Sequence, residues 1–284
     1  MKAAYGGRMT KAPTSRFKVE VLDGDRTSRR EDVVVTEEPL ELRLEWPGRP
    51  PEPLVVTMRT PGADFELAAG FCLGEGFAVR PDAIRTVGYC TDVKLTREQQ
   101  FNTVTVTFDG PPDREPPQRY GVTSAACGVC GQQSLDELAE REYDPVDPVE
   151  VPVDVVRRLP DLLRDAQPTF SRTGGLHAAG LFTADGRKVV VKEDVGRHNA
   201  VDKVVGWTVL NQHSRKGLVL AVSGRAGYEI IQKAVAAGIG MIVAVGAPSS
   251  LAVDLARRFN VTVAGFARGD RCVVYSAPER VTRA

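Results

Sequence analysis

The sequence has no long apolar run and no surplus of either charge. It contains 37 basic and 37 acidic side chains, for a formal net charge of +0. A general nucleic-acid binder needs excess Lys and Arg to displace counterions from phosphates, so the balance argues against that class. No stretch approaches the ~20 apolar residues that cross a membrane, and residues 1–16 lack the apolar core of a secretory signal. We therefore expect a cytoplasmic protein that binds neither nucleic acid nor membrane, with a disordered basic tail over residues 1–16.

Cysteine and histidine are also scarce. The chain has three histidines and five cysteines, and an odd number of cysteines without a signal peptide does not indicate a disulfide framework. Cys72, Cys90 and Cys272 each lie singly in apolar or strand-like segments, where cysteine usually packs as a small hydrophobic side chain. Attention therefore falls on the remaining pair, Cys127 and Cys130.

The first part of the chain has the pattern of strands. Phe17–Leu22, Leu40–Trp46 and Phe101–Phe108 alternate apolar and polar residues, which is the period of a half-buried strand. One helix is expected near Asp64–Phe77, and a proline-rich stretch after the third strand marks a loop or hinge. The pattern predicts a strand-rich N-terminal domain over residues 17–120.

From about Ala178, short apolar runs alternate with segments of helical period. Such alternation predicts a mostly parallel sheet with helices on both faces. The predicted fold class is therefore α/β, with a C-terminal domain over residues 146–284. The expected strands are 188–192, 218–222, 241–245, 261–264 and 272–275, and the expected helices are 198–212, 225–237 and 248–259.

The cysteine pair carries the sharpest chemical signal. Two thiols at the spacing of Cys127 and Cys130 can share a metal, cycle through a disulfide or bear a transferable sulfur. Ser134 and Glu137 form a capping box, and the positive end of the helix they begin could lower a thiol pKa. We predict that residues 121–145 form a mobile Cys-x-x-Cys loop followed by this helix.

Two alternatives for the pair have weaker support. A structural zinc site needs four ligands, often from two cysteine pairs, and this chain has no second pair. His177 and His198 could complete a Cys2His2 set, although their spacing is not that of a zinc finger. A dithiol oxidoreductase normally carries its motif directly between a strand and a helix, whereas this pair is flanked by Pro and Gly.

Charged turns next to predicted strands are candidate ligand sites. Arg172–His177 precedes a strand, Lys192–Asn199 joins a strand to a helix, and Ser223–Ala226 forms a third turn. Open α/β sheets bind ligands at the carboxyl ends of their strands, where helix N-termini favour anions such as phosphate. Solvated turns that merely cap their helices are the alternative. The candidate contact residues in these turns are His177, Arg197, His198 and Arg225.

The loop between the last two predicted strands is a further candidate. Phe266 could stack on a base, Asp270 could accept hydrogen bonds from a guanine edge, and Arg268 or Arg271 could hold phosphate. A plain β turn explains the same composition. The loop consists of Phe266, Ala267, Arg268, Gly269, Asp270 and Arg271.

Four long motifs occur in order, and together they resemble the FdhD family, the formate dehydrogenase accessory sulfur carriers. The likeness covers nearly everything from about Phe17 to the C-terminus. The motifs are TSAACGVCG at 123–131, RTGGLHAAG at 172–180, EDVGRHNAVDK at 193–203 and YEIIQKA at 228–234.

The resemblance implies a sulfurtransferase that works as a persulfide carrier. Family members take sulfur from a cysteine desulfurase and pass it to the molybdenum of bis(molybdopterin guanine dinucleotide) before this cofactor enters formate dehydrogenase. The implied persulfide carrier is Cys127, with Cys130 sharing the relay, and the Phe266–Arg271 loop is implied to contact the guanine dinucleotide. The molybdenum cofactor is cargo, so we expect no permanently bound cofactor and no metal site, and by family analogy a homodimer.

The family's C-terminal domain is similar to the cytidine deaminase fold, which raises a different class of function. Zinc deaminases need H-x-E and P-C-x-x-C motifs, but Ala179 and Ala200 stand where the glutamate would follow His177 and His198. Two alternatives to sulfur transfer remain: a cofactor-binding chaperone, and a zinc-binding protein on a deaminase-like scaffold.

Overall fold

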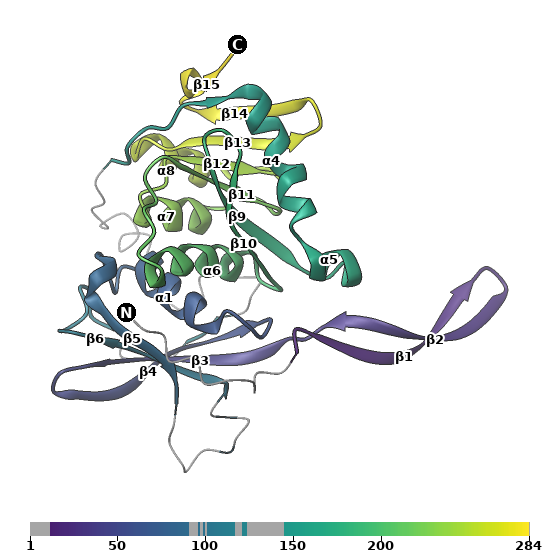
Figure 1. The fold of residues 1–284 in the computed structure, drawn as a ribbon, viewed down its shortest axis with the longest axis horizontal. Coiled ribbons are helices and arrows are strands. Elements are labelled where there is room, and N and C mark those ends of the chain that lie inside the picture. Colours follow the sequence, from purple (N-terminus) through teal and green to yellow (C-terminus); the bar gives the residue numbers. More distant parts are fainter. Residues whose placement is uncertain are drawn as a thin grey trace.

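The computed structural model of the chain describes residues 12–90, 96, 99, 101–116, 121–123 and 145–283. Within these residues it forms two larger sheets, a two-stranded arm and a set of helices between and around the sheets (Figure 1). The elements, in chain order, are β1 (Thr14–Asp23), β2 (Arg26–Val35), β3 (Glu38–Trp46), β4 (Arg49–Arg59), α1 (Asp64–Gly74), η1 (Pro81–Ala83), β5 (Ile84–Tyr89), β6 (Thr103–Phe108), β7 (Gly121–Thr123), β8 (Val151–Pro152), α4 (Val153–Asp165), α5 (Pro168–Thr173), β9 (His177–Thr183), β10 (Lys188–Asp194), α6 (Arg197–Leu210), β11 (Leu218–Val222), α7 (Tyr228–Ala236), β12 (Met241–Ala244), α8 (Ser250–Arg258), β13 (Thr262–Arg268), β14 (Arg271–Ser276), η2 (Pro278–Arg280) and β15 (Val281–Thr282).

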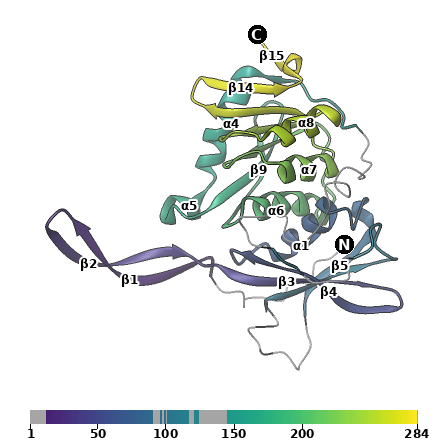
Figure 2. The same ribbon diagram turned by 180° about the vertical axis from the view of Figure 1, so that it is seen from behind.

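The N-terminal part contains a five-stranded sheet in the order β5-β6-β3-β4-β7. Strand β3 alternates exposure as its sequence predicts, with Leu40, Leu42 and Leu44 buried on one face. These leucines pack in the same hydrophobic cluster as α1, so one face of the sheet is covered by that helix. The first strand pair, β1 and β2, does not join this sheet and forms an arm that extends from the body in both ribbon views (Figures 1 and 2).

The C-terminal part contains a six-stranded sheet in the order β10-β9-β11-β12-β13-β14. The expectation of a mostly parallel sheet is wrong. Only β11, β12 and β13 pair parallel with one another, and the other neighbouring strands of the sheet pair antiparallel. The physical reason is local, because tight turns at Gly186 and Gly269, both with positive φ, fold β9 back onto β10 and β13 back onto β14. A hairpin requires antiparallel pairing, whereas only the longer helical crossovers give parallel pairs.

Helices cover both faces of this sheet, as predicted. One hydrophobic cluster joins its inner face to α6 and α7 and continues through α1 into the five-stranded sheet. A second cluster lies on the outer face, where Val155, Val156, Leu159 and Leu163 of α4 pack against the sheet. The molecule is therefore layered in the order five-stranded sheet, α1, α6 with α7, six-stranded sheet and α4 (Figure 1).

Helices α1 and α6 cross in close contact because a glycine lies on each side. A Cβ added at Gly70 would lie 1.9 Å from the backbone oxygen of Asp202, and one at Gly206 would lie 1.7 Å from the backbone oxygen of Glu66. No larger residue fits at either position without separating the helices. This contact fixes the N-terminal sheet relative to the start of α6.

The helices near 64–77, 198–212, 225–237 and 248–259 are confirmed, each with slightly shorter bounds than predicted. Strand β1 begins at Thr14, inside the segment expected to be a tail. The helix expected from Ser134 lies outside the described residues. In the part of the chain that the structure describes, no helix is long and apolar enough to cross a membrane. The expected likeness to the cytidine deaminase fold stays a prediction.

Candidate functional site

The carboxyl ends of the parallel strands form one continuous edge. Backbone hydrogen bonds join the turns that follow them, from Gly246 N to Gly224 O at 3.0 Å and from Phe266 N to Gly246 O at 3.1 Å. Ser223 joins the turn after β11 to β9 at the same edge. Its backbone N donates to Ala178 O at 3.0 Å, and its Oγ accepts from Ala178 N at 2.9 Å. The predicted turn after β11, the turn after β12 and the start of the predicted loop at Phe266 are therefore neighbours at the edge where α/β sheets bind ligands.

His177 lies at the same edge, although the antiparallel direction of its strand was not predicted from the sequence. It follows a helix and begins β9, and it arrives at the carboxyl edge because β9 runs antiparallel to β11. A Cβ placed on Gly224 would lie 3.5 Å from His177 Nδ1 and 3.6 Å from Arg197 Cδ, so the absence of a side chain at Gly224 leaves room between the two. Burial, Arg197 and His198 all lower the pKa of His177 below its ordinary value. The ring is therefore neutral at neutral pH and can either donate or accept a hydrogen bond.

Two helices point their N-termini at this edge without a side-chain cap. Helices α6 and α7 begin after Gly196 and Gly227, whereas α8 is capped by Ser249, whose Oγ accepts from Ala252 N at 3.3 Å. Uncapped amides and the helix dipole together favour an anion. His198 is not open to this edge, because it is buried and its Nε2 lies 2.9 Å from Glu229 Oε2 in the first turn of α7. Of the residues predicted in the turns, His177 and Arg197 lie together, the exposed Arg225 lies in the next turn, and His198 ties α6 to α7.

A buried carboxylate, that of Asp194, holds the start of α6 in place, and its role was not predictable from the sequence. Asp194 accepts hydrogen bonds from Thr60 N at 3.1 Å, Gly196 N at 2.8 Å and Asn199 Nδ2 at 2.9 Å. Its Oδ2 also lies 2.6 Å from Lys203 Nζ, and neither side chain is exposed by more than 2%. Both residues lie inside the motif at 193–203, and Asp194 also lies in the predicted turn 192–199, but nothing in that charged stretch indicated that their side chains are buried.

The predicted loop Phe266–Arg271 is the end of a hairpin. Strand β13 continues to Arg268, which pairs with Arg271 across a turn at Gly269 and Asp270. Phe266 has a φ of 49°, a left-handed conformation that is costly for an aromatic residue, and its side chain is 47% exposed. Ala267 is fully buried and packs in the outer cluster, so it offers only its backbone. The hairpin presents one exposed ring and two arginines beside the edge.

The predicted sulfur carriers, Cys127 and Cys130, lie outside the described residues. Of the cysteines in the described part, Cys72 is fully buried, and burial followed by the nearby Asp202 raises the pKa of its thiol well above the usual range. Cys90 and Cys272 are half-buried rather than buried as expected. Within the described ranges, no three His, Cys, Asp or Glu side chains gather closely enough to hold a metal ion.

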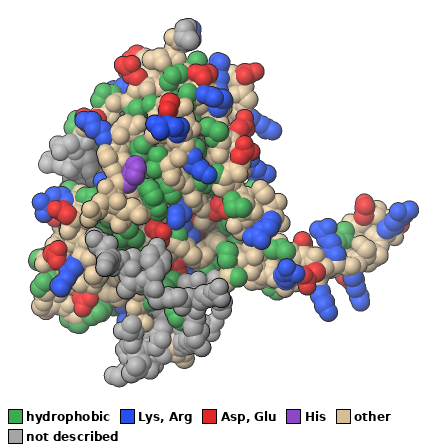
Figure 3. Space-filling view, viewed as in Figure 1, with side chains coloured by type: hydrophobic (Ala, Val, Ile, Leu, Met, Phe, Trp, Pro, Cys, Tyr) green, Lys and Arg blue, Asp and Glu red, His purple; other side chains and the backbone are tan. Residues whose placement is uncertain are grey.

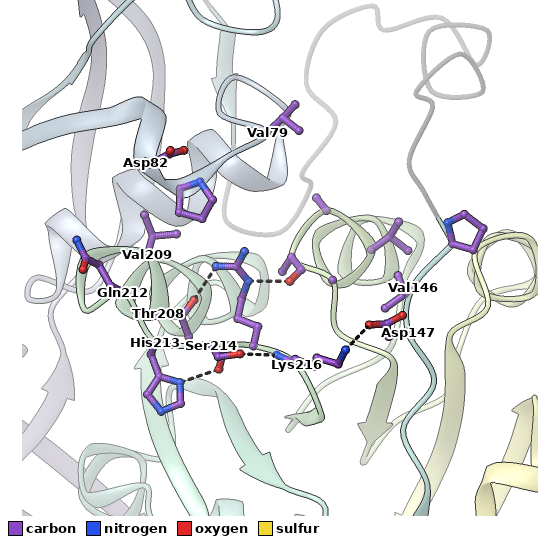
Figure 4. Close-up of a pocket in the computed structure, with 17 residues that line it drawn as sticks. Val79, Asp82, Val146, Asp147, Thr208, Val209, Gln212, His213, Ser214 and Lys216 are labelled. Carbon is purple, nitrogen blue, oxygen red and sulfur yellow. Dashed lines mark hydrogen bonds and ion pairs between the residues drawn. The ribbon is translucent and has the colours of Figure 1, made fainter.

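A cleft of about 800 Å³ lies at the opposite end of the parallel strands (Figure 4). Its charged side chains already have partners, since Arg215 Nε donates to Ala237 O at 2.7 Å and Lys216 Nζ lies 3.2 Å from Asp147. The C-terminal ends of α6 and α7 line it, and their partial negative charge disfavours phosphate. None of the predicted site residues lines this cleft, so the carboxyl edge is the better candidate for an anionic ligand.

The comparisons with known proteins agree with this architecture. A sulfur carrier protein FdhD from Mycobacterium tuberculosis is 43% identical over 278 residues, covering 95% of this chain and 99% of the relative. The protein of the same name from Streptomyces coelicolor is 46% identical over 277 residues, covering 94% and 95%. A crystal structure from Desulfotalea psychrophila, described as that of a proposed formate dehydrogenase accessory protein, matches with a TM-score of 0.76 and 26% identity over 95% of this chain and 100% of that one. Residues 35–282 match the model of the FdhD/NarQ family, and the chain therefore belongs to that family.

Proposed function

We propose that the protein is a sulfur carrier required for formate dehydrogenase activity. It receives sulfur from a cysteine desulfurase on Cys127 and delivers it to the molybdenum of bis(molybdopterin guanine dinucleotide). Relatives that share nearly its whole length are named sulfur carrier proteins. The observation that best supports the proposal is where the cysteine segment is attached to the fold.

Strand β7 attaches that segment close to the candidate site. Thr123 is paired with Thr57 of β4, and Thr57 Oγ1 donates to Asn199 Oδ1 in the first turn of α6 at 3.4 Å. Cys127 follows Thr123 by four residues, and covalent geometry limits their Cα separation to about 14 Å. The short tether keeps the proposed carrier within reach of the start of α6, whatever path the chain takes.

The carboxyl edge has the chemistry that a guanine dinucleotide needs. Uncapped amides at the starts of α6 and α7 suit phosphate oxygens, and Arg225 and Arg271 add exposed positive charge beside them. The exposed ring of Phe266 suits stacking on a base. Neutral His177 adds a hydrogen-bonding group without changing the charge of the site.

The proposed sulfur transfer accounts for every atom and electron without an added cofactor. The Cys127 thiolate attacks the outer sulfur of the desulfurase persulfide, the sulfur–sulfur bond of that persulfide breaks, and the desulfurase thiolate leaves. Cys127 then carries the sulfur as a persulfide. Attack by the Cys130 thiolate on Cys127 Sγ forms a disulfide and releases the outer sulfur as sulfide for the molybdenum. The two electrons that reduce the sulfur come from the two thiols, so a cellular thiol reductant must regenerate the pair.

Complementation tests the proposal. In a strain that lacks its own accessory protein, the wild-type chain is expected to restore formate dehydrogenase activity, and Cys127→Ala is expected to restore none. Cys90→Ala is the matched control, because Cys90 is half-buried and follows β5, at the opposite edge of the five-stranded sheet from β7. Full activity with Cys127→Ala would contradict the proposal and favour a chaperone that binds the cofactor without carrying sulfur.

The proposal includes a cytoplasmic homodimer that meets both the desulfurase and formate dehydrogenase. These partners follow from the family resemblance.

A further inference from the structure

Two ion pairs cross the interface between α6 and α7. In the first turns of the two helices, His198 Nε2 lies 2.9 Å from Glu229 Oε2. One turn further along, Lys233 Nζ lies 2.8 Å from Asp202 Oδ1, with neither side chain more than 4% exposed. On each helix the two members stand four residues apart, so both pairs lie on the facing sides of the helices. A buried interface of this kind stays stable when each charge has a counter-charge beside it.

Glu229 places a negative charge close to the candidate site. It is the second residue of α7, whose uncapped N-terminus faces the carboxyl edge. A carboxylate in the first turn interacts favourably with the helix dipole that would also attract a phosphate, and without a counter-charge it repels an anion bound there. Charges of both signs are interspersed over the visible face of the molecule (Figure 3), so the charge balance at the edge depends on groups close to it.

The other charges around this pair already have close partners. Asp194 lies 2.6 Å from Lys203, and Lys233 lies between Asp202 and Glu75. In the part of the chain that the structure describes, no Lys or Arg side chain lies within 4 Å of Glu229. Its close basic partner there is therefore His198.

His198 makes this contact and no other polar one among the described residues. Its ring is buried, and Nδ1 has no hydrogen-bond partner in those ranges. A carboxylate at 2.9 Å favours the protonated ring, and a neutral ring would leave the charge of Glu229 without compensation. The side chain is therefore placed to supply charge to Glu229 rather than to bind elsewhere in the fold.

We propose that His198, with a proton on each ring nitrogen, neutralises Glu229 and thereby allows the start of α7 to bind a phosphate of the guanine dinucleotide. His198 acts through Glu229 and does not touch the ligand. Glu229 in turn stabilises the first turn of α7 without repelling the ligand. This inference rests on the proposed function, because it concerns the edge proposed to hold the cofactor.

GDP affinity in a double-mutant cycle tests the proposal, with calorimetric titration of four proteins at one pH and one salt concentration. His198→Gln keeps an amide that can donate to Glu229 but removes the positive charge, so the Kd for GDP is expected to rise about tenfold. Glu229→Gln removes the negative charge instead and is expected to bind GDP at least as tightly as the wild type. The double variant carries neither charge and is expected to return to within about twofold of the wild-type Kd.

A purely structural tie between the helices gives a different pattern. If the pair only holds α6 against α7, both single variants weaken GDP binding and the double variant binds no better than either. That pattern, or equal affinities in all four proteins, would overturn the proposal. His213→Gln is the matched control, because His213 is exposed beyond the opposite end of α6 and its replacement should leave the Kd unchanged.

Urea unfolding shows whether each variant is folded at the temperature of the titration. Should His198→Gln fail to fold, the other two variants still decide the matter, because weaker GDP binding by Glu229→Gln would contradict charge neutralisation. A wild type that binds no GDP would overturn this inference together with the proposed cofactor edge. Sulfur loading of Cys127 does not enter the titration, so the sulfur-carrier proposal and this inference fail separately.

Discussion

Asp194 and Lys203 form a fully buried ion pair, with Lys203 Nζ 2.6 Å from Asp194 Oδ2, at the point where the N-terminal sheet meets the start of α6. The same carboxylate accepts a hydrogen bond from the backbone of Thr60, and Lys203 Nζ donates to Thr60 O at 2.9 Å. The pair therefore joins the turn before α1 to the helix start at the candidate site. Its removal should disturb stability and the site together.

Asp194→Asn is expected to lower the free energy of unfolding by about 3–5 kcal/mol, because it leaves the Lys203 charge buried without its partner. The double variant Asp194→Asn/Lys203→Met should lose less than the sum of the two single variants. Urea unfolding measures all of these. Asp154→Asn is the control, since its ion pair with Arg158 is exposed and should matter little. A loss for Asp194→Asn no larger than for this control would contradict the role given to the pair.

Replacing Phe266 by glycine is expected to raise the stability of the protein and to weaken its binding of GDP. Phe266→Gly relieves a left-handed φ of 49° and is expected to raise stability by about 1 kcal/mol. It also removes the proposed stacking ring and should weaken GDP binding about tenfold. Ala277→Gly relieves a similar φ of 46° away from the hairpin end and should stabilise without changing GDP affinity. Calorimetric titration and thermal unfolding give the two readouts, and unchanged GDP affinity in Phe266→Gly would remove the ring from the site.

The lowered pKa of His177 makes the free energy of unfolding depend on pH. Burial, Arg197 and His198 lower its pKa, so the unfolded chain takes up a proton at this residue before the folded chain does. The contribution of His177 to the free energy of unfolding is therefore complete above the ordinary pKa of about 6.5 and falls as pH drops toward the lowered value. NMR titration should show a midpoint below 6.5 that rises in Arg197→Gln. A midpoint at or above the ordinary value would show that burial and the nearby Arg197 do not act on the ring as described.

The contact of α1 with α6 should tolerate no added side chain. Gly70→Ala would place a Cβ 1.9 Å from Asp202 O, and separating the helices is expected to cost about 3 kcal/mol of stability. Gly110→Ala serves as control, because nothing lies within 4 Å of the Cβ it would add. Equal unfolding midpoints for the two variants in urea would show that α1 and α6 do not cross as closely as described.

Much of the C-terminal half was predictable because its signals are local. Apolar runs and glycine stops indicated α7 and β12 to within a few residues, and charged turns beside strands indicated the edge where His177 and Arg197 meet. The direction of the strands was harder to predict from the sequence. The turn at Gly186 reverses the chain, and a short apolar strand has the same composition in a parallel pair as in a buried antiparallel one.

The role of Asp194 could not be predicted for a different reason. In the sequence it is one acidic residue in a charged stretch, and acidic residues usually lie in solvent. Its burial depends on Lys203, Asn199 and Thr60, and Thr60 lies 134 positions earlier in the chain.

The most direct test of the sulfur-carrier account is mass spectrometry of the intact protein after incubation with a cysteine desulfurase and cysteine, followed by peptide mapping without reductant. The account predicts one added sulfur atom on Cys127 in Cys130→Ala, where no neighbouring thiol can displace it, and none on the buried Cys72. In the wild type it predicts the same Cys127 persulfide together with the Cys127–Cys130 disulfide that forms when Cys130 displaces the sulfur. Absence of added sulfur on Cys127, with the desulfurase itself loaded, would contradict the account.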